Sequence, residues 1–330
     1  MEEIRNNKKH PWLLAIPAVA VVGMIGMVIF TSISRTEKAD QTGKIKVIAS
    51  LDSYGEMAKA VLGNQGSVTS IMDKPDMDPH EFEPTSADAK IYQKANVIIS
   101  NGGGFDNWSV NFAKQNTDAK AINLAKLYDF EGEHDHDHEH EDAESHDHAH
   151  EEEETGNEHF WYKTDVATRL SKQLVKTYSK LEPSERTYFQ KNADKYLATL
   201  TDLNAMQQQV KRDLQGKNVM ATEPVFDNTL IDLGANVLNQ SFSKAVNEHQ
   251  DPTPEDIRNW NAAIDDGEVS VVIYNPQSTG KLAKQAMTYA KEHGVPVVQA
   301  TETKPAGKTY AEWQYDQLKA LDEALKKWHY

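Results

Sequence analysis

The feature that most restricts the fold is a tract at 131–154 that no hydrophobic core can contain. It reads EGEHDHDHEHEDAESHDHAHEEEE and holds thirteen carboxylates, seven histidines and no Lys or Arg. Its like charges repel and it has almost no apolar surface to offset the entropy lost on folding. The seven histidines are His134, His136, His138, His140, His146, His148 and His150. The fold must therefore be built from the segments on either side of this tract.

The chemistry of the tract indicates divalent metal. Imidazole nitrogens suit late first-row ions such as zinc, and carboxylate oxygens suit harder ions. A flexible strand that carries both predicts an auxiliary loop that collects metal with low affinity. The alternative is a solvated acidic linker, but solubility alone does not require seven interleaved histidines.

Charge and cysteine content narrow the class of protein further. The formal net charge is -16, and the tract supplies thirteen of those negative charges, which leaves about -3 for the other 306 residues. The remainder lacks the basic field that nucleic-acid binding needs. There is no cysteine, so a metal site must use His, Asp, Glu or backbone groups, and a lipid-modified N-terminal Cys is excluded.

An apolar stretch precedes the rest of the chain. Residues 11–33 carry no charge, and this length of 23 residues is about what a bilayer core requires. Basic residues before it favour a cytoplasmic N-terminus. We expect a cytoplasmic stub and uncleaved anchor over 1–35, a spacer over 36–43, and a main body outside the cytoplasm at the cell membrane. A cleaved signal peptide and a buried core helix are the alternatives.

Strand and helix patterns alternate on both sides of the tract. The expected strands span 44–50, 67–72, 96–100, 217–222, 269–274 and 295–300. The expected helices span 54–62, 86–94, 164–180, 185–214, 226–233, 279–292 and 310–328. Such alternation predicts mainly parallel sheets flanked by helices. We therefore expect an α/β protein with two lobes, 44–184 (with a disordered loop at 131–157) and 216–330, joined by one long linker helix at 185–215.

Four residues outside the tract form a candidate metal site. His80 lies in MDPHEFEP after a strand, and His159 lies in NEHFWY directly after the tract. Glu223 and Glu302 each follow a strand of the second lobe. Ligands of open α/β sheets bind at the carboxyl ends of strands. Two nitrogen and two oxygen donors from the two lobes are a plausible ligand set for a divalent cation.

Each of these residues also has a simpler interpretation. A histidine in a loop is more often a surface residue, and a Glu after a strand often stabilises the start of a helix. Other nearby acids can replace or assist the chosen ones, and they are Asp78, Glu81, Glu83 and Asp227. His249 and His293 lie in polar turns and are expected to have no role.

The segments DPHEFEPTSAD, ANVIISNGGGFDNW, HFWY and TEPVFDNTLIDLGA resemble the solute-binding proteins of zinc and manganese ABC importers. The resemblance covers nearly all of 44–330, including a His-rich acidic loop that is typical of zinc-binding members. It implies two α/β lobes, a rigid linker helix, one metal between the lobes, and ligands at His80, His159, Glu223 and Glu302. At the fourth ligand position this chain has Glu302, where the family usually has Asp.

The resemblance also implies a function. We expect a monomeric extracytoplasmic receptor that captures Zn²⁺ or Mn²⁺ and delivers it to an ABC permease, without enzymatic activity. Two carboxylates lean toward manganese, whereas the tract and the Irving–Williams order favour zinc. The alternatives are a cell-surface metal buffer or chaperone without a transporter, a zinc hydrolase, for which no HExxH motif occurs, and a surface adhesin.

Overall fold

A computed structural model describes residues 45–75, 79, 82–130, 156–278 and 280–327. The chain divides into two units, 1–42 and 43–330, and all described residues belong to the second. The predicted anchor and the His-rich tract lie outside the described residues. Within the described part, no helix has both the length and the apolar character needed to cross a membrane.

The first lobe is built on a four-stranded parallel sheet with the order β2-β1-β3-β4. Its strands are β1 (Ile45–Leu51), β2 (Gly66–Met72), β3 (Val97–Ser100) and β4 (Lys120–Asn123). Its helices are α2 (Asp52–Leu62), α3 (Ser86–Tyr92), α4 (Asn107–Gln115) and α5 (Leu124–Leu127). Helix α3 begins with a capping box in which the hydroxyl of Thr85 and the carboxylate of Asp88 each accept a backbone N–H.

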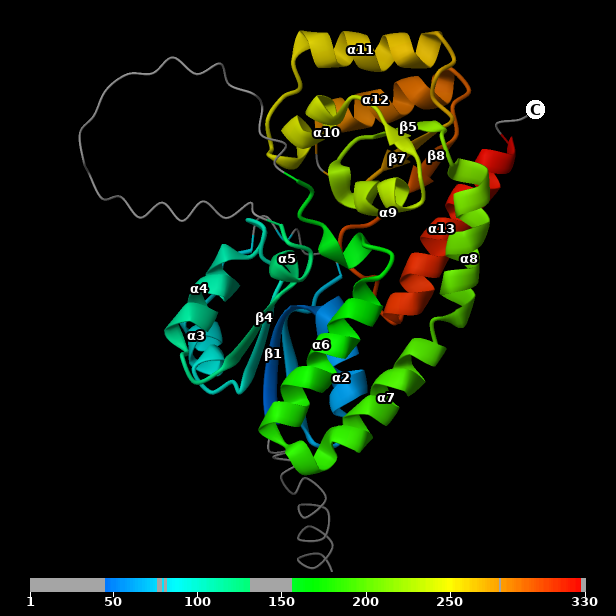
Figure 1. The fold of residues 1–330 in the computed structure, drawn as a ribbon. Helices are drawn as coiled ribbons and strands as arrows, with labels where there is room; N and C mark the ends of the chain where they lie inside the picture. Colours follow the sequence, from blue (N-terminus) through cyan, green and yellow to red (C-terminus); the bar gives the residue numbers. More distant parts are fainter. Residues whose placement is uncertain (1–44, 76–78, 80–81, 131–155, 279, 328–330) are drawn as a thin grey trace, which may run out of the picture. The chain divides into compact units, whose positions relative to one another are not determined.

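The second lobe repeats this arrangement with the order β6-β5-β7-β8, again all parallel. Its strands are β5 (Asn218–Ala221), β6 (Asn236–Val237), β7 (Val271–Tyr274) and β8 (Val297–Gln299). Its helices are α9 (Asp227–Asp232), α10 (Gln240–Asn247), α11 (Pro254–Asp265), α12 (Lys281–Glu292) and α13 (Tyr310–Lys327). Two parallel α/β lobes, as the sequence predicted, are confirmed (Figure 1).

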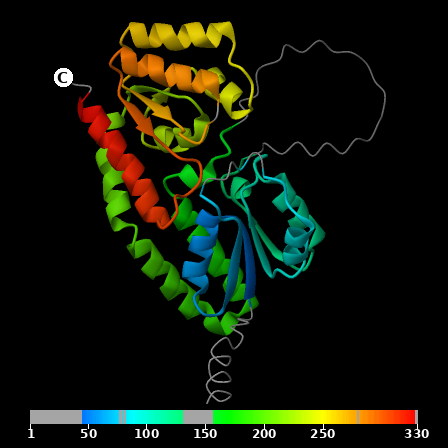
Figure 2. The same ribbon diagram turned by 180° about the vertical axis from the view of Figure 1, so that it is seen from behind.

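The chain passes from the first lobe to the second through α6 (Val166–Leu181), α7 (Arg186–Ala198) and α8 (Thr201–Leu214). The prediction of one continuous linker helix over 185–215 is wrong, because α7 and α8 are separate helices. The hydroxyls of Thr199 and Thr201 donate to the carbonyl oxygens of Tyr196 and Ala198 at 2.6 and 2.8 Å. Such local side-chain bonds compete with the helical ladder. Helix α7 packs on α2 and α6, whereas α8 lies along α13, as both views show (Figure 2).

The side-chain alternation of the central strands sorts the core into layers. Val47 and Ala49 of β1 face the side of the sheet that carries α2 and α6, and Ile48 faces the opposite side. Val271 of β7 belongs to the same cluster as Val47, although the two residues lie in different lobes. The largest apolar core is therefore continuous between the lobes and includes the linker helices.

Candidate metal-binding site

The strand order places Glu223 at the position where an open sheet binds its ligand. The connections leave β5 and β7 toward opposite edges of the sheet, so a crevice forms where these two strands end. Glu223 follows β5 and Asn275 follows β7. The Asn275 Nδ2 donates to Glu223 Oε2 at 2.6 Å, and both side chains are buried. Packing of the sheet thus fixes one carboxylate at the crevice.

His159 and Glu302 meet directly at the same site. His159 precedes a short 3-10 turn, Phe160–Tyr162, and its side chain is fully buried, while Glu302 follows β8 and is 5 % exposed. The His159 Nε2 lies 3.4 Å from Glu302 Oε1. The structure therefore brings together two residues that are 143 positions apart in the chain, one from each side of the linker.

Asn157 orients the His159 ring. Its Oδ1 accepts the backbone N–H of His159 at 2.9 Å and lies 2.7 Å from Nδ1. Because an amide oxygen can only accept, a neutral ring carries its proton on Nδ1 and directs the Nε2 lone pair toward Glu302. Two lone pairs that face each other in a buried site are favourable only with a cation, whether a proton or a metal, between them. This is a geometry that suits metal binding.

Gln277 holds the chain at Glu302 and links it to the first lobe. Its Oε1 accepts the backbone N–H of Glu302 at 2.6 Å, and its Nε2 donates to the Pro75 carbonyl oxygen at 2.9 Å. The Thr303 hydroxyl donates to the same Pro75 oxygen at 2.6 Å. Pro75 lies in the loop after β2, so these bonds connect the segment that precedes His80 to the second lobe.

Burial raises the free-energy cost of a negative charge at this site that no cation balances. Burial raises the pKa of Glu223, and the charge of Glu302 adds to this, whereas hydrogen bonds and His159 oppose it. Burial also raises the pKa of Asp227 to about 7, with His159 lowering it in part. The Asp227 Oδ1 is buried and has no hydrogen-bond partner among the described residues. A bound cation would relieve both carboxyls.

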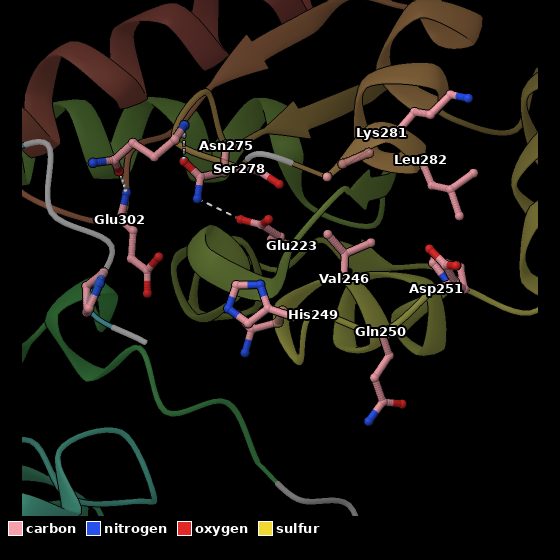
Figure 3. A pocket seen from close by; sticks show the side chains of 16 residues that line it. Glu223, Val246, His249, Gln250, Asp251, Asn275, Ser278, Lys281, Leu282 and Glu302 are labelled. Atoms are coloured by element: carbon pink, nitrogen blue, oxygen red, sulfur yellow. Dashed lines mark hydrogen bonds between the residues drawn. The ribbon is translucent and has the colours of Figure 1, made fainter. Parts of the chain in front are cut away.

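A cavity of about 220 Å³ opens onto the two carboxylates (Figure 3). Glu223 and Glu302 are two of its lining residues, and so is Pro79, the residue directly before His80. His80 itself and the seven tract histidines lie outside the described residues. Among the residues that are described, no three His, Cys, Asp or Glu side chains are grouped closely enough to hold a metal. The described site is thus a His–Glu pair with Glu223 nearby.

The sequence patterns did not identify Asn157, Asn275 or Gln277, which position the candidate ligands. Asn157 lies two residues before His159, and a second hydrogen bond to a metal-binding imidazole is a general requirement. This general requirement was the only sequence-based reason to select Asn157. The bonds of Asn275 and Gln277 depend on tertiary contacts that no local pattern encodes.

The two lobes of parallel α/β structure hold a buried pair of candidate ligands, in which Glu302 follows a strand and His159 precedes a short 3-10 turn. A family profile described as "ZnuA: Zinc-uptake complex component A periplasmic" matches residues 47–324. The chain belongs to this family. The description names a component of an uptake complex rather than an enzyme, which agrees with the prediction from sequence.

Two individual relatives are named as zinc-binding or zinc uptake proteins. The zinc-binding protein AdcA of Streptococcus pyogenes serotype M6 is 26% identical over 283 residues, which are 83% of this chain and 53% of AdcA. The chain thus spans about half the length of that relative. The high-affinity zinc uptake system protein ZnuA of Bacillus subtilis is 25% identical over 263 residues, 78% of each chain.

A solved structure shares the fold. It is that of a Mn-bound periplasmic metal binding protein from Candidatus Liberibacter asiaticus, with a TM-score of 0.63 and 18% identity. The match covers 85% of this chain and 99% of the other. At this identity the likeness concerns the fold alone.

Proposed function

We propose that this protein is the extracytoplasmic receptor of a metal uptake system and that it holds one divalent cation between its lobes. The proposed ligands are His80, His159, Glu223 and Glu302. The cation is the cargo, which the receptor delivers to an ABC permease in the membrane. The proposal rests on the family, on the names of the zinc-binding relatives, and on the buried pair that His159 forms with Glu302.

The single observation that carries the proposal is the 3.4 Å between His159 Nε2 and Glu302 Oε1. Two donors that each lie about 2.05 Å from a tetrahedral zinc ion are about 3.4 Å apart. The spacing of this pair therefore fits two neighbouring donors to one divalent cation, and the choice of zinc as the cargo rests on the names of the zinc-binding relatives.

Charge balance supports the same ligand set. Two neutral imidazoles and two carboxylates give a 2+ ion a site of zero net charge, which lowers the desolvation cost of burying it. The raised pKa of Glu223 in the metal-free protein is consistent with this, since its burial is not matched by a nearby cation. Asp227, whose pKa burial raises and His159 lowers in part, is an alternative carboxylate ligand.

Three further elements of the proposal concern parts outside the described residues. We propose that 11–33 anchors the protein in the membrane, that the main body acts as a monomer, and that the tract at 131–154 gathers metal near the site. The tract is tethered next to His159, so metal on it has a high effective concentration at the inter-lobe site.

The test is calorimetric titration of the purified chain with zinc and with manganese in three forms. One form is intact, one lacks 131–154, and one carries His159→Ala with Glu302→Gln. A Cβ at Gly156 would lie 2.3 Å from Cε2 of Phe130, so the flanks of the tract touch and a short Gly-Ser linker can close the deletion. His293→Ala, a histidine outside the site that interacts with Tyr289 and Asp265, is the matched control.

We expect one tight zinc ion per chain in the intact, tract-deleted and control forms. The double variant should bind zinc more than about 100-fold more weakly, because two ligands are lost. If tight binding disappears with the tract and persists in the double variant, the inter-lobe site is wrong and a metal buffer is the better description. Equal or tighter manganese binding would reverse the choice of cargo. Zinc uptake by cells that carry each form then tests delivery.

A further inference from the structure

The ends of four helices in the second lobe share one hydrogen-bond pattern. After each of α9, α10, α11 and α12, one N–H bonds the carbonyl three residues back and the next N–H bonds the carbonyl five residues back. For α12 these bonds are Gly294 N to Lys291 O at 3.1 Å and Val295 N to Ala290 O at 2.9 Å. This is the Schellman ending, which requires a left-handed residue and usually has glycine there.

Three of these four helices follow the rule and one does not. Gly234, Gly267 and Gly294 occupy the left-handed position after α9, α11 and α12, with φ of 92, 70 and 78°. After α10 the position holds His249, with φ of 55°. A side chain at this position costs conformational energy that glycine avoids. The same ending after α5 holds Asp129, with φ of 52°, so a polar side chain is tolerated at this position and the role of the imidazole depends on its surroundings.

His249 lies at the cavity of the candidate site. It lines the same cavity as Glu223 and Glu302, and Figure 3 shows its ring on the side of the cavity near these carboxylates. His249 is exposed, as are its neighbours Gln250 and Asp251, whereas Glu223 and Glu302 are buried. The cavity therefore has an exposed histidine at its mouth and buried carboxylates at its floor.

We propose that His249 is an entry ligand, which binds the incoming cation at the mouth of the cavity and passes it to the buried site. This inference rests on the proposed function, because it concerns how the cargo reaches that site. A hydrated cation must exchange water for protein donors before it reaches Glu223 and Glu302. An imidazole at the mouth supplies the first donor while most of the water is still bound, and the carboxylates then replace it.

The surroundings of His249 fit a transient role rather than a permanent one. A permanent ligand is buried, as His159 is. His249 is exposed, and Lys281, which also lines the cavity, adds a positive charge that disfavours a cation resting there. We therefore assign His249 to the rate of capture and not to the final affinity.

The test is stopped-flow zinc association with the whole chain and with His249→Gly. Glycine removes the imidazole and suits the left-handed backbone, so the variant should fold at least as well as the parent. His293→Ala is the matched control. It removes another exposed histidine, at the helix-end residue just before the glycine that follows α12, and His293 is not among the residues that line the cavity. We expect the association rate to fall about tenfold in His249→Gly and to stay unchanged in His293→Ala.

The dissociation rate should fall by a similar factor, so that the equilibrium affinity of His249→Gly stays within about threefold of the parent. An unchanged association rate would overturn the inference. So would a large loss of affinity with an unchanged association rate, since that result describes a permanent ligand. Failure of the proposed function looks different, because zinc would then bind weakly to the parent chain, whatever residue stands at 249.

Discussion

Asn157 controls the candidate site without being one of its metal donors. Its side chain fixes the His159 tautomer and also donates to the carbonyl oxygen of Pro224, directly after Glu223. The Asn228 Nδ2 in turn donates to the His159 carbonyl oxygen at 2.9 Å. Asn157 and Asn228 thus fix the position of His159 relative to the second lobe. The quality of the site depends on these supporting residues as much as on the donors.

Asn157→Ala should lower zinc affinity by about 10- to 100-fold, the usual effect of losing a bond that orients a metal-binding imidazole. Competition titration with a zinc-binding dye measures it. Asn236→Ala, which removes an exposed amide that donates to the Gly216 carbonyl oxygen at 3.3 Å, is the control. Unchanged affinity in Asn157→Ala would show that His159 is not oriented through Nδ1.

Asp227→Asn should stabilise the metal-free protein at pH 8 by about 2–4 kcal/mol. Burial raises the pKa of Asp227 from 3.8 to about 7, so above pH 7 the folded protein holds a buried charge that the unfolded chain exposes to water. Between pH 7 and pH 4 the folded form keeps its proton while the unfolded form loses it, so this cost shrinks as the pH falls.

The measurement for Asp227→Asn is urea unfolding in the presence of a chelator at several pH values. The stability gap between variant and parent should close as the pH falls from 7 to 4. A gap that stays constant over this range would contradict the raised pKa and point to a packing effect instead.

Single residues divide clearly into those that sequence reasoning can find and those that it cannot. Glu223 and Glu302 were accessible because both follow recognisable strands, and the sheet order then brings strand ends together. Gln277 was not accessible, since its partners Pro75 and Glu302 lie 202 and 25 residues away and its own segment has no distinguishing pattern. Hydrogen-bond partners of this kind depend on the tertiary arrangement.

At the scale of elements, the backbones of β1 and β2 approach closely where β2 begins. Gly66 pairs with Ile45 of β1, and a Cβ at Gly66 would lie 1.9 Å from the Ile45 carbonyl oxygen and 2.9 Å from Leu62 Cδ2. No rotamer change moves a backbone oxygen. Glycine is required here so that helix α2 and strand β2 can follow each other closely.

Gly66→Ala should therefore destabilise the protein by about 1–3 kcal/mol, the usual cost of overpacking. Gly280→Ala is the matched control, because its Cβ would meet only ordinary contacts of 3.5–3.8 Å. Thermal unfolding of both variants measures the difference. Equal stability of the two would mean that β2 can shift away from β1 without loss.

Elements with strong periodicity were predictable, and short or interrupted ones were not. The central strands β1, β3, β5 and β7 are runs of apolar residues that the sequence shows directly. Strand β6 has only two residues, Asn236–Val237, and offers no period to detect. The break between α7 and α8 lies beside two threonine hydroxyls that bond nearby carbonyl oxygens, within an otherwise helical pattern that predicted one helix.

At the scale of the whole molecule, the two lobes share one core and several polar ties. Lys304 follows β8, and its Nζ lies 2.9 Å from Asp52 Oδ2 and 3.5 Å from Glu56 Oε2. Both acids belong to α2 of the first lobe. The two-lobe architecture was visible in the repeated strand–helix pattern. The shared core was not, because alternation within a strand shows which residues are buried and not which lobe covers them.

Residues 43–330 should unfold in a single calorimetric transition, since the apolar core is continuous between the lobes. Free zinc at 100 times its dissociation constant should add about 2.7 kcal/mol of stability to that transition. Differential scanning calorimetry with and without zinc tests both statements. Two separate transitions, with only one shifted by zinc, would show that the lobes are independent and that one of them alone holds the metal.

The contact between Phe130 and Gly156 has a consequence for how such proteins diverge. Because the chain leaves and rejoins the described fold at one point, the two lobes place no restriction on the span of a segment inserted between Phe130 and Gly156. Doubling the length of such a loop costs only about 0.6 kcal/mol of closure entropy. The segment between these two residues can therefore change in length or composition at little cost in folding free energy, while the lobes and their site keep the same contacts.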